Sequence, residues 1–152
     1  MPHTFKNATH QDFDLLCQIQ RRSKAYWGYP PEIMDIFMEQ YGLQPEMVQP
    51  ELVKILMNDS APIGYYAFVL SENEPLYLDS FFIDPPYIGH GWGRVMWDAC
   101  LQTAKDLGAT TFTLWSDPEA DNFYRKMGCR EIGAKQSVLM PNRYPMMFAC
   151  DL

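Results

Sequence analysis

The stretch that most constrains the fold is Gly89-His90-Gly91-Trp92-Gly93, which lies between a mostly apolar run and an amphipathic segment. The run Leu76–Ile83 predicts a strand, which Pro85-Pro86 ends. Beyond the glycines, apolar residues recur at helical spacing as far as Gly108, which predicts a helix. A strand, a glycine-rich loop and a helix N-terminus together predict a backbone site for an anion such as a pyrophosphate, with Arg94 adding one positive charge.

Other readings of this loop fit less well. A P-loop requires Gly-Lys-Ser/Thr after the glycines, and none follows. A dinucleotide-binding fold requires the spacing G-x-G-x-x-G, whereas this loop has G-x-G-x-G; Asp117, after the next strand, would be its ribose-binding acid. Too few residues follow the loop to build a doubly wound sheet. A structural glycine turn that binds no ligand is a further alternative.

The rest of the chain predicts an α/β fold around one sheet. Further strands are expected at His3–Asn7, Glu51–Met57, Ile63–Leu70, Thr110–Trp115, Arg130–Met140 and Pro145–Asp151, and further helices from Thr9 to about Lys24, from Pro31 to about Tyr41 and over Ala120–Met127. The strands at 51–57 and 63–70 are expected to pair as an antiparallel hairpin. No linker or repeat interrupts the pattern, so residues 1–152 are expected to form a single domain.

The composition narrows the class of function. A hydrophobic fraction of 47% supports a packed core, and the formal net charge of −7 argues against nucleic-acid binding while suiting a cationic amine. The apolar runs are too short to cross a membrane, and the N-terminus lacks a signal-peptide pattern, so a cytoplasmic location without membrane contact is expected. The cysteines and histidines do not fall at metal-ligand spacing, so no metal is expected.

Three motifs give the chain a family resemblance. The glycine loop, with Gly91 and Gly93, and the segment Ser116–Cys129 resemble the GNAT superfamily of acyl-CoA-dependent N-acetyltransferases. The family's phosphate loop is Arg/Gln-x-x-Gly-x-Gly/Ala, and here Ile88 stands at the Arg/Gln position. The family's Ala-x-x-Phe-Tyr-x-x-x-Gly-Phe helix is matched except that cysteine replaces the last aromatic. The segment 22–29, Arg-Ser-Lys-Ala-Tyr-Trp-Gly-Tyr, is similar to the first helix of a group of small bacterial GNAT proteins.

The resemblance implies a mixed central sheet of about six to seven strands, splayed between the fourth and fifth strands and flanked by about four helices. Acetyl-CoA would lie in the gap between Phe81–Ile83 and Trp115-Ser116. The cofactor-binding residues that the resemblance and the loop imply are Phe81, Phe82, Ile83, Ile88, Gly89, His90, Gly91, Trp92, Gly93, Arg94, Asn122 and Tyr124. The implied reaction is direct acetyl transfer from acetyl-CoA to a primary amine of a small molecule or peptide in a ternary complex.

Two side chains are candidates for proton transfer. The match to the family's Phe-Tyr helix implies that Tyr124 lies near the CoA sulfur, where it would protonate the departing thiolate; the alternative is that it anchors a short helix. Asp79 interrupts an apolar strand, so burial is expected to raise its pKa and suit it as the base or as a relay through water. A structural carboxylate is the alternative. The backbone N–H of Ile83 is the oxyanion donor implied by the family.

The acceptor is expected to contact aromatic residues after the first helix. Tyr26, Trp27 and Tyr29 would hold it together with Asp79, or would instead close the core. Arg143-Tyr144, before the last strand, is expected in the same cleft. A second hypothesis is a non-catalytic acyl-CoA-binding or sensing module, which the departure at position 88 favours.

One helix also offers a candidate dimer surface. Trp97 and Leu101, on the helix after the glycine loop, are expected either to form the interface of a homodimer or to be covered by the C-terminal strands.

Overall fold

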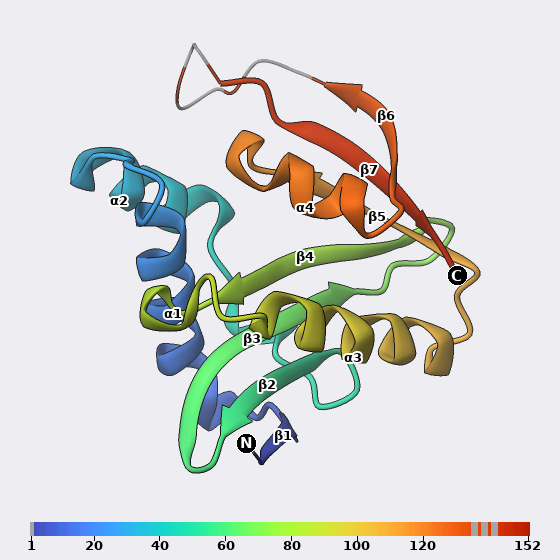
Figure 1. Ribbon diagram of the computed structural model, residues 1–152, viewed down its shortest axis with the longest axis horizontal. Coiled ribbons are helices and arrows are strands. Elements are labelled where there is room, and N and C mark those ends of the chain that lie inside the picture. The colour runs from blue at the N-terminus through green and yellow to red at the C-terminus, as the bar shows by residue number, and fades with distance from the viewer. Residues whose placement is uncertain (1, 135–136, 138–139, 141–142) are drawn as a thin grey trace.

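The computed structural model describes residues 2–134, 137, 140 and 143–152, and within them the chain forms one mixed sheet (Figure 1). Its strands are β1 (His3–Asn7), β2 (Val53–Asn58), β3 (Ala61–Val69), β4 (Leu76–Ile83), β5 (Thr111–Ser116), β6 (Arg130–Ala134) and β7 (Met146–Asp151). The described strands are ordered β1-β2-β3-β4-β5-β7-β6. Neighbours are antiparallel except β4 and β5, which are parallel.

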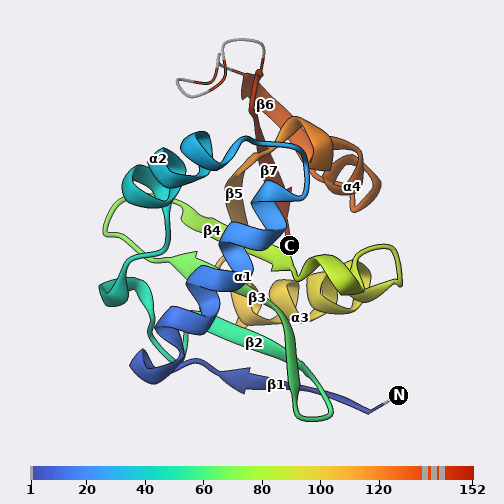
Figure 2. The same cartoon turned by 90° about the vertical axis from the view of Figure 1, so that its left-hand side faces the viewer.

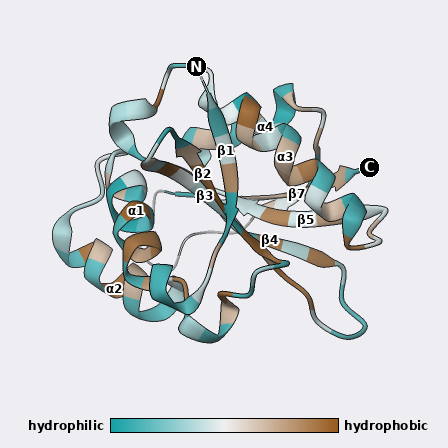
Figure 3. Cartoon of the chain, turned by 90° about the horizontal axis from the view of Figure 1, so that it is seen from below, coloured by the Kyte–Doolittle hydropathy of each residue, from teal (hydrophilic) through white to brown (hydrophobic). Residues whose placement is uncertain are grey.

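Two helices cover each face of this sheet (Figures 2 and 3). The helices are α1 (Phe13–Ala25), α2 (Pro31–Tyr41), α3 (Trp92–Asp106) and α4 (Asp121–Lys126), with 3₁₀ turns at His10–Asp12, Pro45–Met47, Pro85–Tyr87 and Pro118–Ala120. α1 and α2 lie on one face, and α3 and α4 lie on the other. The sequence dictates several ends: Asp12 accepts a hydrogen bond from the Thr9 N–H at 2.9 Å, and Pro31 occupies the first turn of α2.

Each face has its own hydrophobic core. Under α3 and α4 the core includes Trp97, Phe112 and Phe148, and under α1 it includes Leu16 and Ile19. Trp97 is only 2% exposed and makes ring contacts with Phe112 at 5.8 Å. Of the two alternatives that the sequence left open, a surface position in a dimer interface is therefore excluded for Trp97, because its ring fills the core between α3 and the sheet.

The predicted elements are present within the described residues, most of them within two residues of the expected bounds. The turn of the β2–β3 hairpin is tighter than expected, because Asp59 adopts a left-handed conformation (φ 55°) and β3 already starts at Ala61. The strand expected over Arg130–Met140 ends at Ala134; Ser137 and Met140 are not in a strand, and its other residues lie outside the described residues.

The feature that creates a site is the separation of β4 from β5. The two strands pair only at Leu76–Phe112 and Tyr77–Thr113, and beyond these positions they diverge. At the same point the register of β4 against β3 shifts, because Ser80 pairs with Ala67 but Leu78 pairs with Phe68. The residue left between them, Asp79, is the extra residue of a β-bulge, which bends a strand and re-aims its side chains.

Candidate active site

The glycine loop connects β4 to α3 and has the conformation that the sequence predicts. Gly89 and Gly91 adopt positive φ angles of 85° and 86°, and a Cβ at either would meet no atom within 4 Å, so the backbone conformation alone requires glycine. Gly93 lies close to α4, since a Cβ there would be 3.2 Å from the ring of Phe123, so a larger residue needs this ring to shift slightly. The loop thus presents the unpaired N–H groups of the α3 N-terminus beside α4.

A cavity of about 970 Å³ joins this loop to the diverging strands. Its wall includes residues of the loop and α4 from one face of the sheet and residues of α1 and α2 from the other. The cavity therefore passes through the gap between β4 and β5. The predicted site residues that line it are Trp27, Tyr29, Asp79, Phe81, Phe82, Ile83, Ile88, Gly89, Gly91, Gly93, Arg94 and Tyr124.

Asp79 lies where the gap begins. Its carboxylate accepts a hydrogen bond from the Ser80 hydroxyl at 2.9 Å. Burial raises the pKa of Asp79 above its ordinary value, and the Ser80 hydrogen bond only partly offsets this, so the direction expected from the sequence is confirmed. Burial raises the pKa values of Tyr65 and Tyr77, and the charge of Asp79 adds to both rises.

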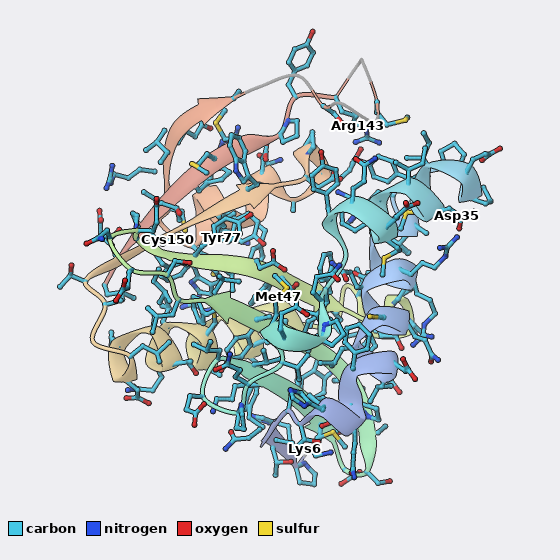
Figure 4. The ribbon with its side chains drawn as sticks, turned by 180° about the vertical axis from the view of Figure 1, so that it is seen from behind. Lys6, Asp35, Met47, Tyr77, Arg143 and Cys150 are labelled. Carbon is cyan, nitrogen blue, oxygen red and sulfur yellow. The ribbon has the colours of Figure 1, made fainter. Side chains whose placement is uncertain are left out.

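Tyr77 is a site residue that the sequence did not reveal. Leu76 and Leu78 pack into the core under α3, so the alternation of β4 points Tyr77 to the other face, where it lines the cavity (Figure 4). Burial raises the pKa of Tyr77 to about 12, the charge of Asp79 adds to the rise, and the backbone N–H of Trp115 opposes it. Its phenol therefore lies between β4 and β5 at the start of the gap.

Tyr124 lies on the opposite face, in α4. Its side chain is 6% exposed and contacts the rings of Phe81, Trp97 and Phe148 at centroid distances of 6.4, 5.7 and 5.7 Å. Burial raises the pKa of Tyr124 well above its ordinary value, so the phenol stays protonated at neutral pH. A thiol in the same apolar surroundings also has a raised pKa, and the difference between the two groups decides the proton transfer.

Two ion pairs hold the last turn of α1 over the ends of the diverging strands. Arg22 donates two hydrogen bonds to Asp84, directly after β4, at 2.9 and 3.0 Å. Lys24 donates to Asp117, directly after β5, at 2.8 Å, and the Tyr29 hydroxyl donates to the same oxygen at 2.5 Å. Burial raises the pKa of Asp117, but Lys24 and Tyr29 lower it more, so this carboxylate stays ionised.

Arg143 completes this cluster from the C-terminal segment (Figure 4). Its guanidinium lies 2.9 Å from Glu119 and 3.7 Å from Asp117, and it stacks over the Tyr29 ring at 5.0 Å. Arg143 also lines the cavity, as the sequence predicts, whereas the neighbouring Tyr144 does not and is exposed.

Other predicted site residues lie off the cavity wall. Tyr26 is 52% exposed and packs edge-on against Trp27, and Trp92 packs against the His3 ring. His90 is exposed. Asn122 accepts a hydrogen bond from Arg125 at 2.9 Å on the outside of α4. The structure does not bring these four residues together with Asp79.

A sequence pattern accompanies the missed residues Lys24 and Asp117, although it does not show that they meet. Each diverging strand is followed by an Asp-Pro pair, Asp84-Pro85 after β4 and Asp117-Pro118 after β5. The segment Arg-Ser-Lys of α1 carries a cation for each of these carboxylates. Phe37, whose ring lies 5.1 Å from the Lys24 ammonium, had no comparable signal because it is one apolar residue of an amphipathic helix.

The part of the chain that the structure describes contains no group of three or more His, Cys, Asp or Glu side chains arranged to hold a metal ion. Among the described helices, none has the length and apolar character needed to span a bilayer.

A glycine loop at a helix N-terminus, opening on parallel strands that diverge at a bulge, defines the acyl-CoA-dependent N-acetyltransferase class. The family model described as "Acetyltransferase (GNAT) domain" matches residues 30–147. The chain belongs to the GNAT acetyltransferase family.

Known proteins agree with this assignment. The peptidyl-lysine N-acetyltransferase YjaB of Salmonella typhimurium is 28% identical over 151 residues, which cover 93% of each chain. The GCN5-related N-acetyltransferase structure from Rhodopseudomonas palustris has a TM-score of 0.78 at 16% identity, covering 100% of this chain and 97% of that one. The PaiA N-acetyltransferase of Thermoplasma acidophilum, solved in complex with coenzyme A, has a TM-score of 0.71 at 17% identity, covering 97% and 98%. These two structures share the fold.

Proposed function

We propose that this acetyltransferase moves the acetyl group of acetyl-CoA directly to a primary amine, of a small molecule or a peptide, in a ternary complex formed by one domain spanning residues 1–152. The observation that carries the proposal is that the glycine loop and Asp79 line the same cavity. Such a transfer needs a site for the anionic cofactor and a base for the amine. The glycine loop would supply the first, and the buried carboxylate, whose pKa is raised, would supply the second. The coenzyme A in the PaiA structure and the lysine acceptor in the name of the Salmonella relative support the two substrates.

In this mechanism the pyrophosphate lies at the glycine loop and the pantetheine runs along β4 at Phe82 and Ile83. Asp79, directly or through water, takes a proton from the acceptor ammonium, and the neutral amine attacks the thioester carbonyl. The Ile83 N–H stabilises the oxyanion while the new C–N bond forms and the C–S bond breaks. Tyr124 gives its proton to the thiolate, and the nitrogen of the new amide loses its second proton, which restores the phenol, so the products are an N-acetyl amide and free CoA, with the first proton released from Asp79 to solvent.

One observation favours the second hypothesis, a binding module without turnover. Ile88 lines the cavity at the position where the family has Arg or Gln, so this side chain cannot donate a hydrogen bond to phosphate. The backbone donors and Arg94 remain at this end of the cavity. The retention of Asp79 and Tyr124 on the same wall favours the enzyme.

Calorimetry with acetyl-CoA, with NADH as the control, tests the cofactor half of the proposal, and release of free thiol with added amines tests the transfer. We expect micromolar binding of acetyl-CoA, no binding of NADH, and thiol release that depends on the amine. Binding without amine-dependent thiol release would favour the binding module. Absence of acetyl-CoA binding would contradict both hypotheses.

A further inference from the structure

The charges on the cavity wall differ between its two ends. At the end formed by the glycine loop and α4 the charged wall residues are Arg94 and Lys126. Among the described residues Arg94 forms an ion pair only with Asp98, at 3.4 Å, and both side chains are about two-thirds exposed, while Lys126 has no ion-pair partner there. Exposed pairs are screened by water and are easily exchanged, so both cations are available to phosphate.

At the other end, the charged side chains are almost all neutralised by one another. Lys24 pairs with Asp117, and Arg143 pairs with Glu119. Asp79 is the exception, because no lysine, arginine or histidine among the described residues lies within ion-pair distance of it. This end therefore offers one uncompensated carboxylate, which matches one ammonium group.

The helix side of this end carries large apolar side chains beside the polar residues Gln20, Ser23, Gln40 and Gln44. Its large side chains come from the α1–α2 connection, from α2 and from the turn after it: Trp27, Ile33, Met34, Phe37, Tyr41 and Met47. The Lys24 ammonium already lies 4.9 Å from the Tyr29 ring centroid and 5.1 Å from that of Phe37. A second ammonium on the acceptor would be repelled here by Lys24 and Arg143. An uncharged apolar group would only displace water from the wall.

We propose that the acceptor is a monoamine whose single ammonium binds at Asp79 and whose remaining part is an uncharged apolar or aromatic group packed against α2. This inference rests on the proposed function and narrows it, because polyamines carry additional charges and a peptide lysine carries a polar backbone. The pairing of Lys24 with Asp117 is then a specificity-determining contact, since it removes the second carboxylate that a diamine would need.

Steady-state thiol release with three acceptors tests the proposal: phenethylamine, spermidine and an N-terminally blocked lysine peptide. We expect kcat/KM for phenethylamine to exceed the other two values by about tenfold or more, the discrimination that a small difference in buried apolar area supplies. A value for spermidine or the peptide that equals or exceeds that for phenethylamine would overturn the inference while leaving the acetyltransferase proposal standing. Absence of turnover with any amine, despite acetyl-CoA binding, would overturn the proposed function and this inference with it.

A gain-of-function variant sharpens the test. Lys24→Gln frees Asp117 as a second carboxylate, so the ratio of kcat/KM for spermidine to that for phenethylamine is expected to rise about tenfold, as one added charge interaction allows. Lys105→Gln is the matched control, because Lys105 is exposed at the far end of α3 and off the cavity wall. An unchanged ratio in a Lys24→Gln protein that still binds acetyl-CoA would overturn the role of the pair. If that variant loses acetyl-CoA binding, the wild-type panel alone decides.

Discussion

The two ends of the cavity are built from different parts of the chain. Backbone groups of the glycine loop and of the end of β4 form one end, where Gly89 and Gly91 fix the path by their positive φ angles. Side chains from α1, α2, the bulge of β4 at Asp79 and the segments after β5 form the other end, held by Lys24 and Asp117. A backbone-built site constrains the sequence to glycines at fixed spacing, whereas a side-chain-built site tolerates exchange of its residues. The first end is therefore recognisable from sequence, and the second is the end where we propose that the acceptor binds.

The largest expected effect comes from the side-chain-built end. Asp79→Asn removes the proposed base, so kcat/KM is expected to fall about 10³-fold. The melting temperature near neutral pH is expected to stay the same or rise. Because the pKa of Asp79 is higher in the folded than in the unfolded state, its contribution to stability is present at low pH and is lost as pH rises through the folded pKa, and a neutral amide avoids this loss.

Initial rates and thermal unfolding at pH 7 check this prediction, with Asp106→Asn, exposed at the end of α3, as the control. A fall in both rate and melting temperature for Asp79→Asn would instead identify a structural carboxylate.

The next effect concerns Tyr124, the proposed acid in α4. Tyr124→Phe removes only the phenol oxygen from a ring that packs against Phe81 and Trp97, so acetyl-CoA affinity is expected to stay within about twofold while kcat falls about 10²-fold. Calorimetry and steady-state kinetics on the same preparation measure the two quantities. Normal turnover would show that Tyr124 is an anchor of α4 and not the acid.

A glycine pair tests whether the cofactor end depends on its backbone. Gly91 and Gly108 have nearly the same φ, 86° and 82°, and neither has an atom within 4 Å of an added Cβ. Alanine at either position is expected to cost about 1–2 kcal/mol of backbone strain. Only Gly91→Ala is expected to weaken acetyl-CoA binding, because the loop relaxes when free and must return to the strained conformation to bind the cofactor. If most of that strain is restored on binding, the affinity falls about tenfold. Equal acetyl-CoA affinities in calorimetry would show that the loop backbone does not contact the cofactor.

The smallest effect is expected from a side chain in the backbone-built end. Ile88→Arg restores the residue type of the family's loop and adds one cation at an accessible position, so acetyl-CoA is expected to bind about threefold more tightly at low salt and the gain to vanish at high salt. Titration at two salt concentrations measures this. A gain much larger than tenfold would mean that side chains, and not backbone groups, dominate acetyl-CoA binding at this end as well.

The same contrast explains what could be predicted from the sequence. Periodicity and the Gly/Pro punctuation predicted the elements and the loop, and the break of polarity at Asp79 identified the residue that the structure places in the bulge. The position of Trp97 stayed open between an interface and the core, because the helical pattern of α3 does not show that α4 and β5 both pack against it. Lys24 and Asp117 are separated by 93 residues, and only the tertiary fold shows that they meet.

The short pairing between β4 and β5 has a consequence for the behaviour of the protein in solution. Beyond Tyr77 and Thr113 the diverging strands form a sheet edge inside the molecule, and open edges recruit strands from other chains and lead to aggregation. In the folded state, helices on both faces and the ion pairs of Arg22 and Lys24 cover this edge, so another chain reaches it only when these elements loosen. A ligand that fills this edge also stabilises the folded state by mass action, so we expect the protein without cofactor to be the form that aggregates first on heating.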